Sequence, residues 1–146
     1  MTQIVSKFFD ELSNKELYEI LCARNAVFLM EQRIVCMDTD GVDYRALHCF
    51  IEQNGKIIAY LRAFYDDKQP DTVMIGRVLT TVRSKGYGRA LMESAMREIR
   101  QKLPCARMAL HAQCHAAGFY EKFGFQEASA PFLEEGIAHI LMDLVV

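Results

Sequence analysis

The apolar residues of this chain recur at two spacings, one typical of helices and one typical of strands. Apolar side chains three and four positions apart predict helices over residues 14–30 and from about residue 87 to residue 101. The first helix begins with a capping box, in which the Ser13 and Glu16 side chains satisfy each other's free backbone donors. The second ends before Pro104, which disfavours helical backbone at the residue before it. A shorter helix is predicted over residues 114–122, with Gly124 as its end.

Shorter apolar runs between turn residues predict strands at residues 4–12, 46–53, 56–64, 73–80, 106–112 and 136–146. Asn54-Gly55 predicts a tight hairpin, because both residues tolerate positive φ. The polar stretch 31–43 is interpreted as a loop, and its aspartates Asp38, Asp40 and Asp43 as a solvated turn. The order β-α-β-β-β-α-β-α-β predicts one α/β domain over residues 1–146, with a mixed central sheet flanked by helices.

Composition narrows the class of protein. The chain has 146 residues and a formal net charge of -2, and no basic run suggests a nucleic-acid partner. No apolar run approaches the roughly 18 residues that a membrane-spanning helix needs, and no secretory leader is expected at the N-terminus. Five cysteines without paired spacing indicate free thiols in a reducing compartment. We therefore expect a cytoplasmic protein with no nucleic-acid or membrane partner.

A glycine-containing loop, Arg83-Ser84-Lys85-Gly86-Tyr87-Gly88, lies between a predicted strand and a predicted helix. Its uncovered backbone amides and the positive end of the helix dipole predict an anion site, with phosphate as the obvious ligand. The loop lacks the Lys-Ser/Thr end of a nucleotide-triphosphate loop. It also has Leu91 where a dinucleotide fingerprint needs a small residue. Both of these ligand classes are therefore disfavoured.

A second cluster lies about thirty residues downstream, at Phe119-Tyr120-Glu121-Lys122-Phe123-Gly124-Phe125. Together the two stretches resemble the acetyl-CoA-binding motifs of the GNAT superfamily of N-acetyltransferases, an Arg/Gln-x-x-Gly-x-Gly/Ala loop followed by Tyr-x-x-x-Gly-Phe. Residues 12–32, 75–78 and 135–140 further resemble the ElaA-like branch, so the similarity covers nearly the whole chain. Ser84 departs from the usual loop glycine, and Gln113 stands where many relatives have asparagine.

The resemblance implies a GNAT-like fold and acetyl transfer from acetyl-CoA to a small-molecule or peptide amine, by direct attack in a ternary complex. It implies that Tyr120, a phenol protonated at neutral pH, is the general acid for the leaving thiolate. It also implies the CoA-binding residues, which are Val78, Leu79, Thr80, Arg83, Ser84, Lys85, Gly86, Tyr87, Gly88, Arg89, Gln113 and Phe119.

The general base has several candidates. Glu31 ends the first helix, and Glu135 and His139 flank the last strand. A water relay, or an acceptor that arrives as a free amine, would make a dedicated base unnecessary. No metal is expected, because the histidines and cysteines lack a second ligand pair at metal spacing. A non-catalytic acyl-CoA-binding or protein-interaction module on the same fold is the alternative function, and the protein is expected to be a monomer or homodimer.

Overall fold

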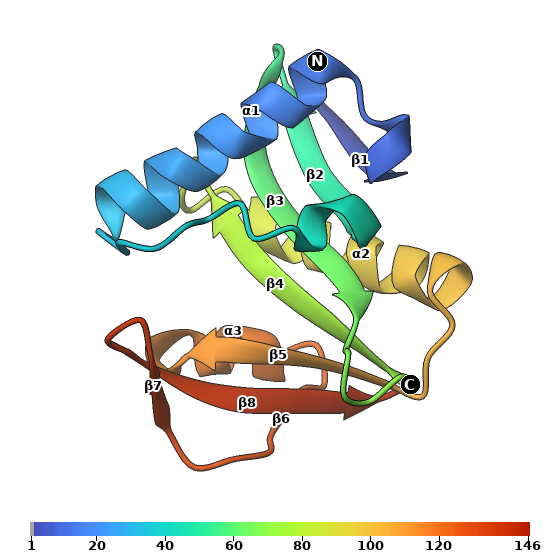
Figure 1. Cartoon of the computed structure of the whole chain (residues 1–146), viewed down its shortest axis with the longest axis vertical. Helices are drawn as coiled ribbons and strands as arrows, with labels where there is room; N and C mark the ends of the chain where they lie inside the picture. Colours follow the sequence, from blue (N-terminus) through green and yellow to red (C-terminus); the bar gives the residue numbers. More distant parts are fainter. Residues whose placement is uncertain (1) are drawn as a thin grey trace.

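One mixed sheet runs through the computed structural model, which describes residues 2–146 (Figure 1). The strands lie in the order β1-β2-β3-β4-β5-β8-β6, and β7 also pairs with β8. All pairs are antiparallel except β4 with β5. The strands are β1 (Thr2–Phe8), β2 (Leu47–Gln53), β3 (Lys56–Tyr65), β4 (Thr72–Thr80), β5 (Arg107–Gln113), β6 (Gln126–Glu127), β7 (Phe132–Glu134) and β8 (Ile137–Val145). The α-helices are α1 (Asn14–Arg24), α2 (Tyr87–Lys102) and α3 (Ala117–Glu121).

Helices cover both faces of this sheet (Figure 1). Helix α1 packs on β3 through a cluster made of Ile20, Ala23, Val27, Phe50, Ile57, Tyr60 and Leu79. Helices α2 and α3 lie on the opposite face, over the larger core cluster. The buried residues of α2 are the five apolar side chains at helical spacing, Leu91, Met92, Ala95, Met96 and Ile99. The predicted α/β fold with a mixed sheet flanked by helices is therefore confirmed.

The first strand is shorter than its apolar run predicts. Strand β1 ends at Phe8, and a 3₁₀ turn follows at Phe9–Glu11. Glu11 Oε1 accepts a hydrogen bond from the Phe8 amide at 2.9 Å, and the Leu12 amide donates to the Phe9 carbonyl at 3.1 Å. These local bonds satisfy the backbone in place of strand pairing, so the chain turns toward α1 before its apolar run ends.

The predicted first helix is one helical run with two hydrogen-bonding patterns. Its capping box is confirmed, since the Glu16 amide donates to Ser13 Oγ at 3.0 Å and the Ser13 amide to Glu16 Oε1 at 2.8 Å. After Arg24 the run becomes a π-helix over Asn25–Glu31. Segments of π-helix are rare in proteins as a whole, but those that occur often lie at functional sites. This one carries Glu31 toward the end of β4.

Two hairpins differ in how well the sequence predicts them. The Asn54-Gly55 turn is confirmed, with φ of 53° and 78°. Glu135-Gly136, at the start of the last predicted strand, forms a second tight turn, with φ of 50° and 76°, which joins β7 to β8. The short strands β6 and β7 were not predicted, because two or three residues are too few to display a period.

Candidate active site

Strands β4 and β5 diverge and open the sheet at one end (Figure 1). They pair in parallel only where Thr72–Ile75 faces Arg107–Leu110. Within residues 2–146, no strand pairs with the β5-facing edge of β4 beyond Ile75. The second half of β4 therefore presents backbone donors and acceptors to the opening, as an edge strand does. This half includes Val78, Leu79 and Thr80, the backbone that the sequence analysis assigned to the cofactor.

A bulge in β4 marks the place where the two strands separate. Tyr60 faces Leu79 and Arg62 faces Gly76, so one residue of β3 opposes two of β4. Arg77, one of those two, has φ of 54°, a left-handed conformation uncommon for a residue with a side chain. Such bulges bend the strand that carries them and increase its twist. The bulge thus turns the end of β4 away from β5.

The glycine loop joins the open end of β4 to the first turn of α2, as the sequence predicts. Gly86 precedes α2 with φ of 75°, and a Cβ added there would meet nothing within 4 Å. No side chain caps the helix, so its first amides are open to a ligand. Ser84 also has a left-handed φ, 62°, a conformation that glycine adopts without steric cost. Lys85 and Arg83 add positive charge, so the loop suits a pyrophosphate.

Gly88 brings α3 close to the start of α2. A Cβ at Gly88 would lie 3.4 Å from the Phe119 ring and 3.6 Å from Thr80 Cγ2. These are ordinary van der Waals distances, so Gly88 lies in close contact with Phe119, which packs between the loop, the end of β4 and the start of α2. Tyr120 follows Phe119, with only 8% of its surface exposed, and burial raises the pKa of its hydroxyl to about 12.

The remaining predicted CoA-site residues lie at the start of α2. Tyr87 is the first helical residue. Arg89 forms an exposed ion pair with Glu93 at 2.9 Å, so its side chain is engaged one turn further along α2.

Two polar contacts join the end of the π-helix to the opening. Arg83 donates to the Glu31 carboxylate and also to Thr80 Oγ1, the latter at 2.9 Å. Gln113, at the end of β5, donates to Gln32 Oε1 at 3.0 Å. The predicted base Glu31 and the predicted phosphate ligand Arg83 are thus partners in this structure. The end of the π-helix therefore contacts both sides of the opening, the loop after β4 through Glu31 and the end of β5 through Gln32.

His139 lies next to Gln113, directly opposite it in the pairing of β5 with β8. Its side chain is largely buried, 8% exposed, and its Nδ1 lies 2.7 Å from the Ile137 carbonyl. Glu135, the other candidate on this side, is exposed in the β7–β8 turn. Of the two, the structure brings His139 to the edge of the opening.

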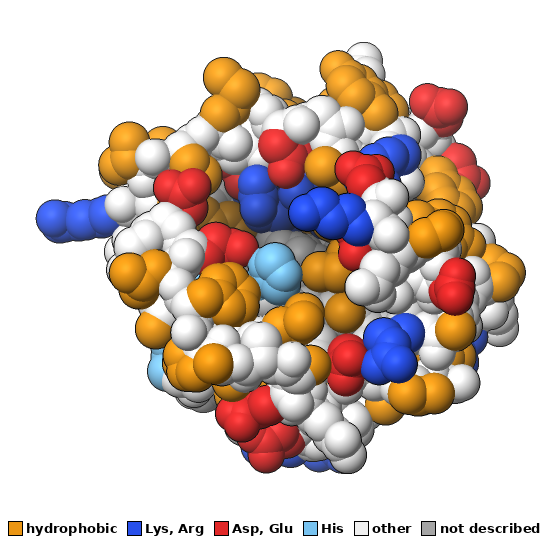
Figure 2. Space-filling view, turned by 60° about the horizontal axis from the view of Figure 1, so that its bottom comes forward, with side chains coloured by type: hydrophobic (Ala, Val, Ile, Leu, Met, Phe, Trp, Pro, Cys, Tyr) orange, Lys and Arg blue, Asp and Glu red, His pale blue; other side chains and the backbone are white. Residues whose placement is uncertain are grey.

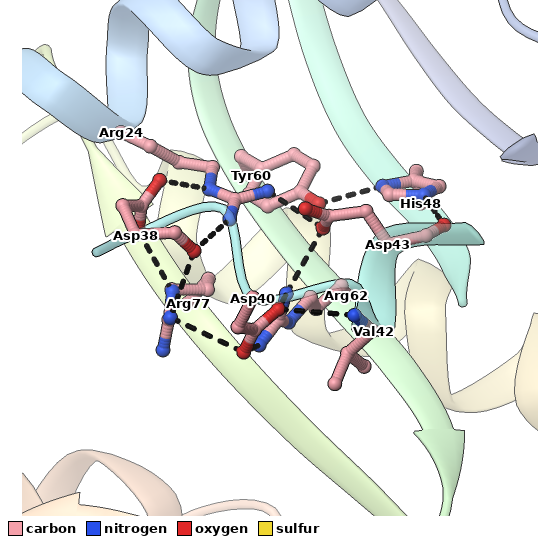
Figure 3. A network of polar contacts seen from close by, with 9 residues as sticks. All are labelled: Arg24, Asp38, Asp40, Val42, Asp43, His48, Tyr60, Arg62 and Arg77. Atoms are coloured by element: carbon pink, nitrogen blue, oxygen red, sulfur yellow. Dashed lines mark hydrogen bonds and ion pairs between the residues drawn. The ribbon is translucent and has the colours of Figure 1, made fainter. Parts of the chain in front are cut away.

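The aspartates interpreted as a solvated turn are instead the anionic half of a buried network (Figure 3). Asp43 Oδ1 accepts from Arg24 at 2.7 Å and from Arg62 at 3.0 Å, and both arginines are almost wholly buried. Asp38 accepts from Arg24 Nε at 2.8 Å. Asp40 pairs with Arg62 at 2.7 Å. The solvated-turn interpretation is wrong because buried guanidinium groups need carboxylate partners, and this loop supplies them.

Arg77 extends the network to the bulge in β4. Its Nε donates to Asp38 Oδ1 at 2.8 Å, and its Nη2 to the Asp38 carbonyl at 3.0 Å. The loop is therefore attached to the strand that forms one wall of the opening (Figure 3).

The network sets the charge states of its members. Burial opposes ionisation of Asp40, but the hydrogen bond and charge of Arg62 outweigh it and lower the pKa of Asp40 to about 2. The pKa of Asp43 is lowered in the same way, by Arg24 and Arg62 against burial. Burial lowers the pKa of His48, which favours the neutral imidazole. Its Nε2 then donates to the Asp43 carbonyl at 2.9 Å, and its Nδ1 accepts from Tyr60 at 2.6 Å.

Figure 2 shows a hollow on the side of the molecule where β5, β7 and β8 lie, with a histidine beside it and charged side chains of both signs around its rim.

No group of three His, Cys, Asp or Glu side chains within residues 2–146 is placed to hold a metal ion. All five cysteines are free thiols. Over the same residues, no helix has both the length and the apolar character needed to cross a bilayer.

Sequence reasoning missed the contacts of Gln32 and Arg77 and the contacts of Glu134 with two histidines, all of which join distant segments. A charged residue inside a buried apolar strand, such as Arg62 within residues 57–64, is a signal for a buried carboxylate partner. The pair Glu135-Gly136 is a signal for the hairpin that places Glu134.

This fold is shared by solved structures that include an acyl-CoA N-acyltransferase. A family model described as an acetyltransferase (GNAT) domain matches residues 26–146. A UPF0039 protein of Schizosaccharomyces pombe is 36% identical over 146 residues, which cover 97% of this chain and 96% of that protein. The structure of an acyl-CoA N-acyltransferase from Pseudomonas aeruginosa superimposes with a TM-score of 0.91 at 31% identity, covering 98% of this chain and 99% of the other.

The crystal structure of Escherichia coli ElaA also gives a TM-score of 0.91, at 32% identity, and covers 98% of this chain and 99% of ElaA. The chain belongs to the GNAT acetyltransferase family, and within it to the ElaA-like branch. The family uses acyl-CoA as co-substrate.

Proposed function

We propose that this protein transfers an acetyl group from acetyl-CoA to a primary amine of a small molecule or peptide, by direct attack in a ternary complex. The observation that carries the proposal is the unpaired edge of β4, which leads directly into the uncapped start of α2. An extended chain with amide groups can pair with such an edge as an added strand does. Pantetheine has this form, and its diphosphate end would then reach the glycine loop.

Each wall of the opening has a chemical role in this proposal. The backbone amides of residues 83–89 hold the pyrophosphate, assisted by the charges of Arg83 and Lys85. The backbone of Val78, Leu79 and Thr80 lines the pantetheine, and one amide there polarises the thioester carbonyl. The opening between β4 and β5 is bordered by Gln113 at the end of β5 and by Phe119 in α3. Acetyl-CoA supplies an activated acyl group and a thiolate leaving group.

Tyr120 is the proposed general acid. Burial raises its pKa to about 12, so the hydroxyl remains protonated at neutral pH and can donate to a departing thiolate. We expect Tyr120→Phe to lower kcat by roughly 10²-fold, since general acids contribute about 10²–10⁴-fold. The affinity for acetyl-CoA, measured by calorimetry, is expected to stay near the wild-type value. An equal loss of turnover and affinity would show that Tyr120 only fills space.

His139 is the proposed proton acceptor for the amine. Among the candidates, Glu31 is already paired with Arg83 and more than half exposed, with 57% of its side chain in solvent. His139 is buried beside Gln113 at the edge of the opening. An imidazole can accept a proton near neutral pH, which suits the deprotonation of an ammonium group.

Thiol release from acetyl-CoA tests the proposal, with a panel of primary amines and a reaction without amine as the blank. Release that depends on both the amine and the enzyme, with an N-acetylated product found by mass spectrometry, would support it. If acetyl-CoA raises the melting temperature but no amine releases CoA above the blank, the protein is an acyl-CoA-binding module. If neither acetyl-CoA nor CoA raises the melting temperature, the proposed cofactor site is wrong.

A further inference from the structure

Strands β5, β7 and β8 bring two histidines and a glutamate together on one face of the sheet. His139 faces Phe132 across the β7–β8 pair, and Glu134 lies two residues further along β7. Glu134 Oε2 lies 3.6 Å from His139 Nε2, and its other oxygen lies 2.8 Å from His111 Nδ1. The Phe132 ring stacks on His139 with 6.2 Å between ring centres, and meets His111 edge-on at 5.2 Å. The two histidines and the glutamate thus form a connected row.

The hydrogen bond to Ile137 determines which nitrogen of His139 can accept a proton. A carbonyl oxygen only accepts, so the Nδ1 that lies 2.7 Å from it must carry the hydrogen. In the neutral imidazole, Nε2 then holds the lone pair. At 3.6 Å, Nε2 and the Glu134 carboxylate are too far apart for a hydrogen bond but close enough for an ion pair once Nε2 is protonated. The arrangement leaves Nε2 available as a base and places an anion where the imidazolium forms.

Glu134 is itself held in place from the other side. An ionised carboxylate only accepts, so His111 Nδ1 donates to Glu134 Oε1. The hairpin turn at Glu135-Gly136 fixes the register that brings Glu134 diagonally across from His139. Glu134 is 45% exposed, so water can reach the pair and remove a proton from it.

His139, at one end of this row of three side chains, lies beside the end of β5, at the edge of the opening. His139 faces Gln113 in the β5–β8 pair, and Gln113 donates to Gln32, the residue after the π-helix. Alternation along β5 places His111 on the same face as Gln113. Among the candidate bases, His139 is therefore the one that pairs directly with the last residue of β5.

We propose that Glu134 is a positioning residue that, supported by His111, stabilises the imidazolium formed when His139 accepts a proton from a cationic primary amine. The proposal rests on the proposed acetyltransfer. The ammonium loses one proton to His139 Nε2, which passes it to water. The neutral nitrogen attacks the thioester carbonyl, the C–N bond forms and the C–S bond breaks. Tyr120 protonates the thiolate, and the second proton lost from nitrogen restores the tyrosine. The sum is an amide, a thiol and one released proton.

The test compares two nucleophiles of different basicity, butylamine, which is protonated at neutral pH, and methoxyamine, which is neutral there. Glu134→Gln keeps the shape of the side chain and removes the anion that faces Nε2, so the imidazolium of His139 loses its ion-pair partner. We expect Glu134→Gln to lower kcat for butylamine on the order of tenfold, and His139→Gln on the order of 10²-fold. Both variants should keep the wild-type KM for acetyl-CoA and most of the turnover of methoxyamine. Glu127→Gln, an exposed carboxylate on β6, is the matched control and should behave as the wild type.

A second measurement does not depend on any acceptor. Nitrogen NMR of the free protein at mildly alkaline pH should show His139 protonated at Nδ1 and bare at Nε2. The opposite tautomer, or equal losses with butylamine and methoxyamine in Glu134→Gln, would overturn the proposal. If the wild type turns over neither amine, the proposed function fails for these acceptors, and the tautomer alone decides whether His139 Nε2 is available as a base.

Discussion

Replacing Asp43 with asparagine is the sharpest test of what holds the candidate site in shape. The side chain is 11% exposed and accepts hydrogen bonds from two arginines, Arg24 at 2.7 Å and Arg62 at 3.0 Å. Arg24 is fully buried and Arg62 is 3% exposed, so neither guanidinium can turn to water instead. Asp43→Asn keeps the shape of the side chain and removes its charge. The variant leaves two buried cations with one carboxylate fewer between them.

The expected loss is about 3 kcal/mol of unfolding free energy at neutral pH, near the lower end of what breaking a buried ion pair costs. The lower end applies because each arginine keeps another carboxylate, Asp38 for Arg24 and Asp40 for Arg62. Urea unfolding followed by circular dichroism measures the change, and the midpoint should fall by roughly 1–3 M at typical denaturant slopes. Asp67→Asn is the control, since Asp67 is 87% exposed and pairs with Arg45 at 3.4 Å.

Lowering the pH provides an independent test, because the direction in which the free energy of unfolding should change is defined. The folded pKa values of Asp40 and Asp43 are below their usual values, so their ionised forms stabilise the fold above about pH 4. That contribution is lost as the pH falls from about 4 toward about 2, the folded pKa of Asp40. The wild type should lose stability across this range more steeply than Asp43→Asn does. Equal slopes, or a midpoint for Asp43→Asn as close to wild type as that of Asp67→Asn, would refute the reasoning.

Two further substitutions probe the glycine loop. Gly86→Ala forces a Cβ into a backbone with φ of 75° and should cost on the order of 1 kcal/mol in a thermal melt and weaken acetyl-CoA binding. Gly118→Ala, in α3 with open space around it and no positive φ, should leave both unchanged or raise the melting temperature. Arg83→Met should raise KM for acetyl-CoA about tenfold, because a charge-assisted hydrogen bond contributes about 1.5–3 kcal/mol. An unchanged KM would mean that Arg83 serves only its pair with Glu31.

The parts of the fold that the sequence predicts are those governed by neighbouring residues. The Ser13–Glu16 capping box, the Asn54-Gly55 turn and the apolar stripe of α2 each act within a few positions of the chain. The glycine loop was predictable for the same reason, since positive φ at Gly86 and close packing at Gly88 are properties of those residues. Local rules therefore predicted the conformation and place of the glycine loop.

The segments that we propose to bind the acceptor were harder to predict because distant contacts hold them together. Arg77 and Asp38 are 39 residues apart, and Gln113 and Gln32 are 81 apart. Neither the spacing of apolar residues nor a turn signal in the sequence indicates which carboxylate pairs with which arginine. The three aspartates were therefore interpreted as a solvated turn, although a lone arginine in an apolar strand already called for a buried anion.

The ion network and the opening of the sheet are linked through one residue. Arg77 sits in the bulge that separates β4 from β5, and its left-handed φ of 54° costs free energy that a glycine would avoid. The hydrogen bond from Arg77 to Asp38 stabilises that conformation, and Asp38 is held in turn by a hydrogen bond from the buried Arg24. The loop over residues 38–43 thus stabilises the bulge, and the bulge keeps the β4 edge unpaired. Loosening the network should therefore narrow or disorder the opening where we propose that pantetheine binds, even though no network residue belongs to the glycine loop.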